Sequence, residues 1–203
     1  MKGNTEEQEL KDRLSLIETM IAEGRRTTES WGWTFVLWGV AYVVAIAWST
    51  WGNSNWAWPV TMIAAGALTG VLASRVERHR PETTVGRAMA SIWIAMGISM
   101  FVLFMAMGIS RRIEDNVFVA VISTMLAMAN ASSSMILKWK VQFACAVVWW
   151  AAAVAACFVS KNHAMIVLLV AIFFGQIVFG LYAMICESRR RRMRKGNQGG
   201  ANA

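Results

Sequence analysis

The stretch HAMIVLLVAIFFGQIVFGLYAMI, residues 163–185, decides the fold class of this chain. It contains no Asp, Glu, Lys or Arg, and it exceeds the ~20 apolar residues with which an α-helix crosses ~30 Å of hydrocarbon. Five more uncharged apolar stretches precede it, at residues 34–50, 57–74, 88–109, 117–137 and 141–159. The sequence therefore predicts an all-α integral membrane protein, a bundle of six transmembrane helices arranged as three helical hairpins.

Lysine and arginine lie almost entirely on one side of these stretches. Of the 20 basic residues, only Arg111, Arg112 and Lys161 lie on the side opposite the two termini. Because the cytoplasmic loops of multi-pass proteins carry the excess of Lys and Arg, both termini are expected in the cytoplasm. Residues 1–30 are charged and lack an apolar core, so no cleavable signal peptide is expected.

The composition points to the same class of protein. Hydrophobic residues make up 57% of the chain and charged residues 16%, with a mean hydropathy of +0.45. The net charge of +8 indicates attraction to an anionic inner leaflet rather than to nucleic acid, because the basic residues flank the ends of the spans. Four consecutive arginines follow the last span and are the predicted lipid-headgroup contacts: Arg189, Arg190, Arg191 and Arg192.

The chain divides into three parts. Residues 1–30 are predicted to form a cytoplasmic leader helix, residues 31–187 the six-span domain, and residues 188–203 a basic, largely disordered cytoplasmic tail. The tail is expected to be disordered because its end, residues 196–203, has no apolar face.

The leader is predicted to be amphipathic. Four apolar residues repeat at helical spacings of 4, 3 and 4: Leu10, Leu14, Ile17 and Ile21. Thr5 and Gln8 fit an N-terminal capping box, and Gly24 with residues 27–28 is expected to break the helix before the first span. We expect the leader to dock on the cytoplasmic end of the bundle. Lying on the membrane surface and pairing with a second copy are the alternatives.

Small residues form stripes at helical spacing on three of the predicted spans. The second span carries Gly66, Gly70 and Ser74, the third Ser91 and Ala95, and the fourth Ser123, Ala127 and Ser134. Helices associate in lipid where small residues let their backbones approach closely. These stripes are therefore predicted helix–helix seams, either within one chain or between copies.

A layer of polar and aromatic side chains is expected near the middle of the membrane. Asn130 and Gln176 lie at similar depths, because their spans run in the same direction and each residue rises 1.5 Å. Tyr42, Ser99 and Trp149 are placed with them as candidate ligand-binding residues. The hypothesis is that the two amides bind one another or a small polar solute. Interhelical hydrogen bonding alone is the alternative.

Nothing in the spans indicates catalysis. They hold no carboxylate, and no nucleophile–base pair, nucleotide-binding loop or metal-ligand spacing occurs in the sequence. Cys145, Cys157 and Cys186 give no disulfide framework. The chain is therefore predicted not to be an enzyme and to have no metal site and no cofactor.

Four segments resemble a family of small bacterial six-span membrane proteins that has a short amphipathic leader helix and no established activity. They are LSLIETMIAEGRR (residues 14–26), FVLWG (35–39), IWIAMGISMF (92–101) and MILKWKVQFACAVVWWAAA (135–153). The resemblance implies a bacterial cytoplasmic (inner) membrane protein. It transfers no catalytic or binding residue.

Three functions are compatible with these features. The first is an accessory or regulatory subunit that contacts a membrane-protein partner or further copies of itself. The second is a small-solute-binding transport component, since its architecture is similar to the six-span substrate-binding components of energy-coupling-factor vitamin importers. The third is a homo-oligomeric channel. We favour the first, because nothing in the sequence demands a ligand.

Overall fold

The computed structural model of the protein describes residues 2–52, 56–77, 84–110 and 114–200. Within these residues the chain is helical and has no β-strand, so the predicted all-α fold class is confirmed. The elements are α1 (Lys2–Ser30), α2 (Gly32–Trp51), α3 (Ala57–Glu77), α4 (Thr84–Ser110), α5 (Asp115–Leu137), α6 (Lys140–Phe158), α7 (Lys161–Ile172), a π-helical segment η1 (Phe173–Val178) and α8 (Phe179–Gly200).

Six helices in the described part of the chain are long and apolar enough to cross a membrane. Five of them are α2, α3, α4, α5 and α6, and the sixth, His163–Met193, runs through α7 and η1 into α8. The six apolar stretches read from the sequence lie on these helices, and only the fifth stretch passes the end of its helix, by one residue. The chain is a multi-pass membrane protein with a six-helix bundle.

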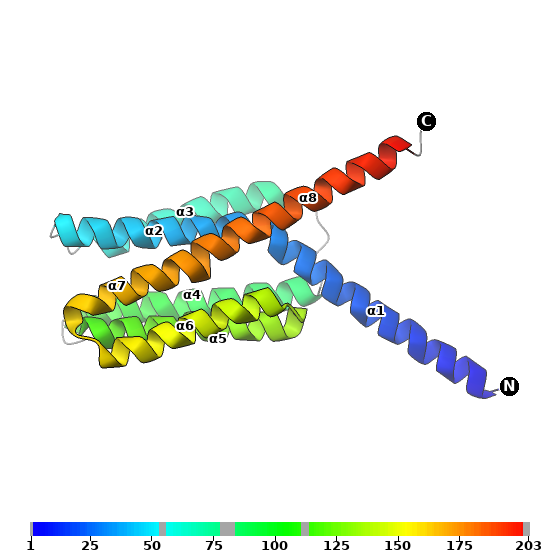
Figure 1. The fold of residues 1–203 in the computed structure, drawn as a ribbon, viewed down its shortest axis with the longest axis horizontal. Helices are drawn as coiled ribbons and strands as arrows, with labels where there is room; N and C mark the ends of the chain where they lie inside the picture. The colour runs from blue at the N-terminus through cyan, green and yellow to red at the C-terminus, as the bar shows by residue number, and fades with distance from the viewer. Residues whose placement is uncertain (1, 53–55, 78–83, 111–113, 201–203) are drawn as a thin grey trace.

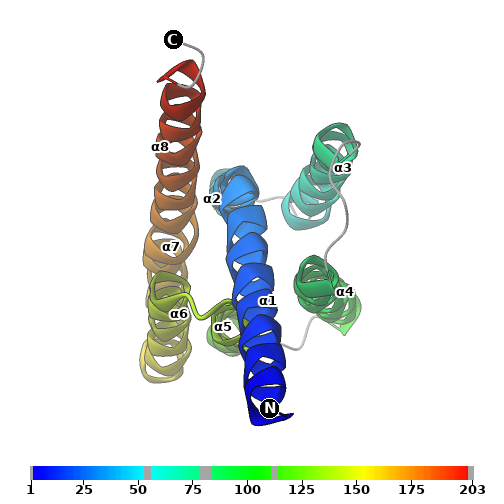
Figure 2. The same ribbon diagram turned by 90° about the vertical axis from the view of Figure 1, so that its right-hand side faces the viewer.

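The spans form two layers of three helices (Figures 1 and 2). In one layer α2 lies between α3 and the α7–α8 helix, and in the other α5 lies between α4 and α6. The rest of the protein buries 61% of the α5 span, but only 11% of the α3 span and 11% of the α4 span. Therefore α5 is the central helix of the bundle, and α3 and α4 are edge helices whose surfaces are mostly uncovered.

The α5–α6 hairpin closes through a very short turn. Lys138 adopts a left-handed conformation, with φ 49° and ψ 41°, directly after the last residue of α5. The backbone N–H of Trp139 then donates to the carbonyl of Ser134 at 3.0 Å, which satisfies a carbonyl at the end of the helix. This turn sends α6 back along α5, and the small residues Ala127, Ser134 and Ala146 are buried in the hairpin.

The first and last spans touch through glycine. Gly32 begins α2 and Gly180 lies one residue into α8, and both are buried where the two helices cross. Because neither residue has a Cβ, the two backbones come closer than larger residues would allow.

Both chain ends leave the bundle at the same end, where α1 and the last part of α8 diverge (Figure 1). The first part of α1 projects beyond the bundle, so the expected docking of the whole leader is wrong: Leu10, Leu14 and Ile17 are exposed. Only the C-terminal part of α1, from about Gly24, packs on the bundle.

Three further expectations for the termini were also wrong. Gly24 does not break α1, because a glycine costs a helix only about 1 kcal/mol and here its missing Cβ makes room for Val85 and Leu137. Thr5 lies inside α1, which begins at Lys2, and so it is not the N-cap. The tail is helical to Gly200, since extending an existing helix avoids the cost of nucleation.

Candidate functional site

The junction of α1 with α8 is the strongest candidate for a functional site, because it buries a carboxylate. The side chain of Glu29, in the last turn of α1, is only 1% exposed. A buried carboxylate is costly unless it is paired with positive charge. The surroundings of Glu29 supply that charge from two different helices.

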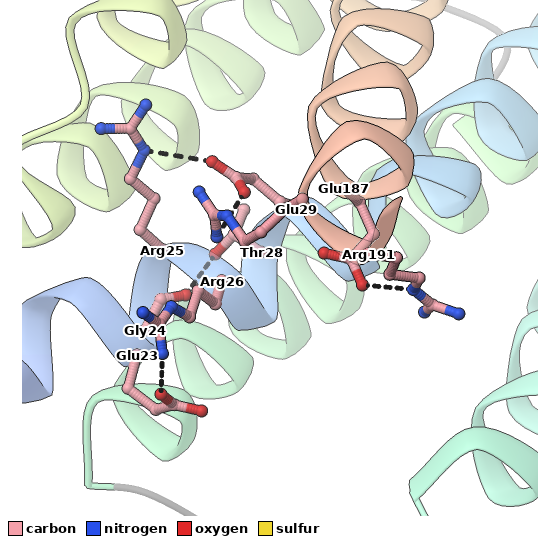
Figure 3. Close-up of polar contacts among 9 residues, drawn as sticks. Glu23, Gly24, Arg25, Arg26, Thr28, Glu29, Glu187 and Arg191 are labelled. Atoms are coloured by element: carbon pink, nitrogen blue, oxygen red, sulfur yellow. Dashed lines mark hydrogen bonds and ion pairs between the residues drawn. The ribbon is translucent and has the colours of Figure 1, made fainter. Parts of the chain in front are cut away.

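Two arginines flank the carboxylate. Arg25, one turn earlier on α1, donates from Nε to Oε1 of Glu29 at 3.2 Å (Figure 3). Arg190 on α8 places Nη1 2.8 Å from Oε2, close enough for an ion pair but not aligned as a hydrogen bond. The first pair joins neighbouring turns of one helix, whereas the second joins residues at opposite ends of the chain.

An aromatic ring and a glycine complete the junction. The Arg25 guanidinium lies 5.2 Å from the ring centroid of Trp139, within the range of a cation–π contact. Trp139 itself is buried in the turn between α5 and α6 and packs against Phe179 of α8. Gly24 lies against Val85 of α4, so the end of α1 touches elements from both layers of the bundle.

This arrangement is a mechanical connection between two helices. The ion pairs hold the carboxylate of Glu29 between Arg25 on α1 and Arg190 on α8. A tilt of α1 would pull on Arg190 and hence on the helix that continues the last span. The junction can therefore transmit a movement of the projecting leader to the membrane bundle.

The predicted polar layer is only partly assembled. Asn130, Gln176, Tyr42 and Trp149 are all buried. Asn130 donates to the carbonyl of Leu126 in its own helix at 2.9 Å, and no hydrogen bond joins it to Gln176 in the described chain. Ser99 is exposed on α4 and bonds to the Ala95 carbonyl, so the structure does not bring it into the layer.

Trp149 meets the π-helical segment. A Cβ added to Gly175 would lie 2.5 Å from the indole Nε1, so the ring occupies the space that a side chain would need. The indole N–H has no hydrogen-bond partner among the described residues. Segments of π-helix occur often at functional sites. Here the segment packs its Gly175 against the ring of the buried Trp149.

A small cavity lies beside this ring, lined by side chains from α2, α3, α5, α6 and α7. Its volume is ≈ 10 Å³, and its lining includes Tyr42, Trp58 and Trp149. That is room for about one water molecule, whereas small-molecule sites occupy roughly 300–1,000 Å³. A solute could enter only if the helices moved apart, so ligand binding by this layer stays a prediction.

The small-residue stripes fall into two groups. On α5 the stripe faces inward, and Ser123, Ala127 and Ser134 are buried within the chain. On the edge helices it faces outward, and the exposed members are Gly66, Gly70 and Ser74 on α3 and Ser91 and Ala95 on α4. The stripe on α5 therefore packs against other helices of the same chain. The stripes on α3 and α4 remain free to contact another copy of the chain.

The four tail arginines also differ from one another. Arg189, Arg191 and Arg192 are exposed, and Arg191 pairs with Glu187 of its own helix at 2.7 Å (Figure 3). Arg190 turns inward to Glu29. The prediction of lipid contact treated the four alike and missed this structural role.

No protein-family model, curated protein or solved structure matches the chain. The resemblance to the small bacterial family therefore stays an expectation. Sequence reasoning missed Glu29 and Arg25 altogether. The one available signal was their spacing, an arginine four residues before a glutamate at the entrance to the first span.

Proposed function

We propose that the chain is a non-enzymatic accessory or regulatory subunit of a bacterial cytoplasmic membrane. It acts through helix–helix contacts with a membrane-protein partner or with further copies of itself. The placement of basic residues supports a topology with both termini in the cytoplasm, facing an anionic leaflet.

The uncovered glycine face of α3 carries this proposal. A Cβ added at Gly66 or at Gly70 would meet no atom of the rest of the described bundle within 4 Å. Apolar side chains alone do not drive association in lipid, whereas glycines that admit a neighbouring backbone do. α3 therefore offers a partner helix a face that its own bundle leaves unused.

The leader and its junction support a regulatory role. The leader projects beyond the bundle with its apolar side chains uncovered, and its C-terminal end is fixed by Glu29 to Arg190. A protein that binds the leader can thus act on the last span without entering the membrane.

The test is to fill the α3 face. Native mass spectrometry of the full-length protein, extracted gently from its own membrane, should show an associated polypeptide or a second copy. Gly66→Leu combined with Gly70→Leu should release it while the thermal stability of the isolated chain stays unchanged, because both positions are exposed and a Cβ at either meets no described neighbour.

The matched control is Val71→Leu. Val71 is exposed on the same helix but lies about 100° around it from Gly70, so the complex should persist. A wild-type monomer, or a monomer that carries only a discrete small molecule, would contradict the proposal.

A further inference from the structure

The leader carries an apolar stripe that the bundle does not cover. Leu10, Leu14 and Ile17 are 59%, 53% and 52% exposed, on the part of α1 that projects away from the other helices (Figure 1). In water such a stripe favours association. The identity of its partner follows from the spacing of the stripe and from the charges beside it.

The spacing is that of a coiled coil. Residues at intervals of 4, 3 and 4 occupy alternating d and a positions of a heptad: Leu10 (d), Leu14 (a), Ile17 (d) and Ile21 (a). In this frame Arg13 occupies a g position and Glu18 the next e position. Leu16, although 60% exposed, occupies a c position on the far side of the helix.

We propose that the leaders of two copies of the chain pair in parallel and in register along this stripe. The inference rests on the proposed function and names its partner as a second copy. In a parallel pair, a g residue of one helix lies beside the following e residue of the other. Arg13 of each copy then meets Glu18 of the second copy, and the two-fold axis repeats this attraction.

The membrane supplies the orientation and the proximity. Two copies inserted the same way up are related by an axis along the membrane normal, so their leaders point in the same direction. Two heptads are short for an independent coiled coil, but tethering to adjacent bundles raises the effective concentration of each leader at the other. Arg13 is available, because its pair with Glu9 on the same helix is exposed and such pairs are weak.

The charge of the leader argues against a lipid partner. Helices that lie on anionic membranes are rich in Lys and Arg. Between Gln8 and Glu23 the leader instead carries more acids than bases: Glu9, Asp12, Glu18 and Glu23 against Lys11 and Arg13. The acidic excess would repel an anionic leaflet.

Cysteine cross-linking of the full-length protein in its own membrane tests the pairing. In a background in which Cys145, Cys157 and Cys186 are replaced by alanine, Leu14→Cys and Ile17→Cys should each form a disulfide-linked dimer on mild oxidation. Leu16→Cys is the matched control, since it is equally apolar and exposed but lies outside the seam, and it should stay monomeric.

Charge reversal tests the register. Arg13→Glu should lower the dimer-to-monomer ratio of the Leu14→Cys protein about tenfold, since two attractive pairs become repulsive. Adding Glu18→Arg should restore it. Asp12→Lys, at an f position away from the seam, is the control and should leave the ratio unchanged.

Three results would overturn the inference. The first is equal cross-linking of the Leu16→Cys and Leu14→Cys proteins, and the second is no cross-linking of any cysteine variant. The third is equal protection of the cysteines in Leu16→Cys and Ile17→Cys from a water-soluble maleimide, which would place the leader on lipid. If the partner bound at Gly66 and Gly70 is retained while no leader cross-link forms, this inference fails and the proposed function survives.

Discussion

Gly180 on α8 and Gly32 on α2 pack backbone against backbone: a Cβ on Gly180 would lie 2.8 Å from the carbonyl oxygen of Gly32, and a Cβ on Gly32 would lie 2.9 Å from that of Gly180. The first and last spans are thus held at a distance that only glycine permits. Because the opposing atoms belong to the backbone, a larger residue could be accommodated only if a whole helix shifted.

Gly180→Ala is therefore expected to destabilise the bundle by about 1–3 kcal/mol, the usual cost of overpacking. Gly70→Ala is the control, because no other described part of the bundle lies within 4 Å of a Cβ at that position and alanine is the better helix former. Thermal unfolding in detergent measures both. Equal losses of stability in the two variants would disprove the close crossing.

The Glu29–Arg190 ion pair predicts an asymmetric result on mutation. Arg190→Ala leaves a buried carboxylate with Arg25 as its remaining ion-pair partner, whereas Glu29→Ala leaves arginines that are 34% and 41% exposed and can reach water. Arg190→Ala should therefore cost more, about 3 kcal/mol if the carboxylate stays buried.

The double variant then measures the pairing itself. Glu29→Ala with Arg190→Ala should be about 1–3 kcal/mol more stable than the sum of the single losses predicts, because the two residues share one interaction. Denaturant or thermal unfolding of the four proteins completes the cycle. Strict additivity would show that the two side chains are not coupled.

Lys138 is expected to be a site at which stability can be gained. It holds φ 49° in the turn between α5 and α6, where a Cβ costs about 1–2 kcal/mol and glycine is the common choice. Lys138→Gly should raise the free energy of unfolding by about 1 kcal/mol. Lys138→Ala removes the same side chain but keeps the Cβ, so it should give no such gain.

Arg189 and Arg192 are expected to bind lipid without supporting the fold. Both are exposed, and a basic residue near an anionic surface contributes about 1 kcal/mol. Replacing both with glutamine should weaken retention of phosphatidylglycerol in native mass spectra while thermal stability is unchanged. Replacing both with lysine keeps the charge and should keep the lipid. Loss of stability in the glutamine variant would instead indicate a structural role.

The positions of the spans could be predicted from the sequence, because crossing hydrocarbon requires a long uncharged stretch and little else. The 163–185 stretch and the five before it all coincide with helices. The pairing of spans was harder to predict. Ser123 and Gly66 both belong to stripes of small residues, yet the first is buried and the second is bare, since a stripe indicates that a helix can pack and not which helix covers it.

The junction could not be predicted for a related reason. Glu29 and Arg190 lie at opposite ends of the chain, and no periodicity links them. Arg190 also belongs to a run of four arginines that the positive-inside rule already explains. Arg190 reaches the buried Glu29 because the last helix continues beyond the last span. A polar sequence gives little indication that a helix continues through it.

The π-helical segment Phe173–Val178 also sets the rotational phase of everything that follows it. A π-turn closes its hydrogen bond over five residues instead of four and so accommodates one more residue, while each residue advances an α-helix by about 100°. If the same residues were wound as a regular α-helix, the far half of the last span would be turned by about that angle. Gly180 would then point away from Gly32, and Arg190 away from Glu29. The extra residue in the π-turn thus keeps Gly180 facing Gly32 and Arg190 facing Glu29.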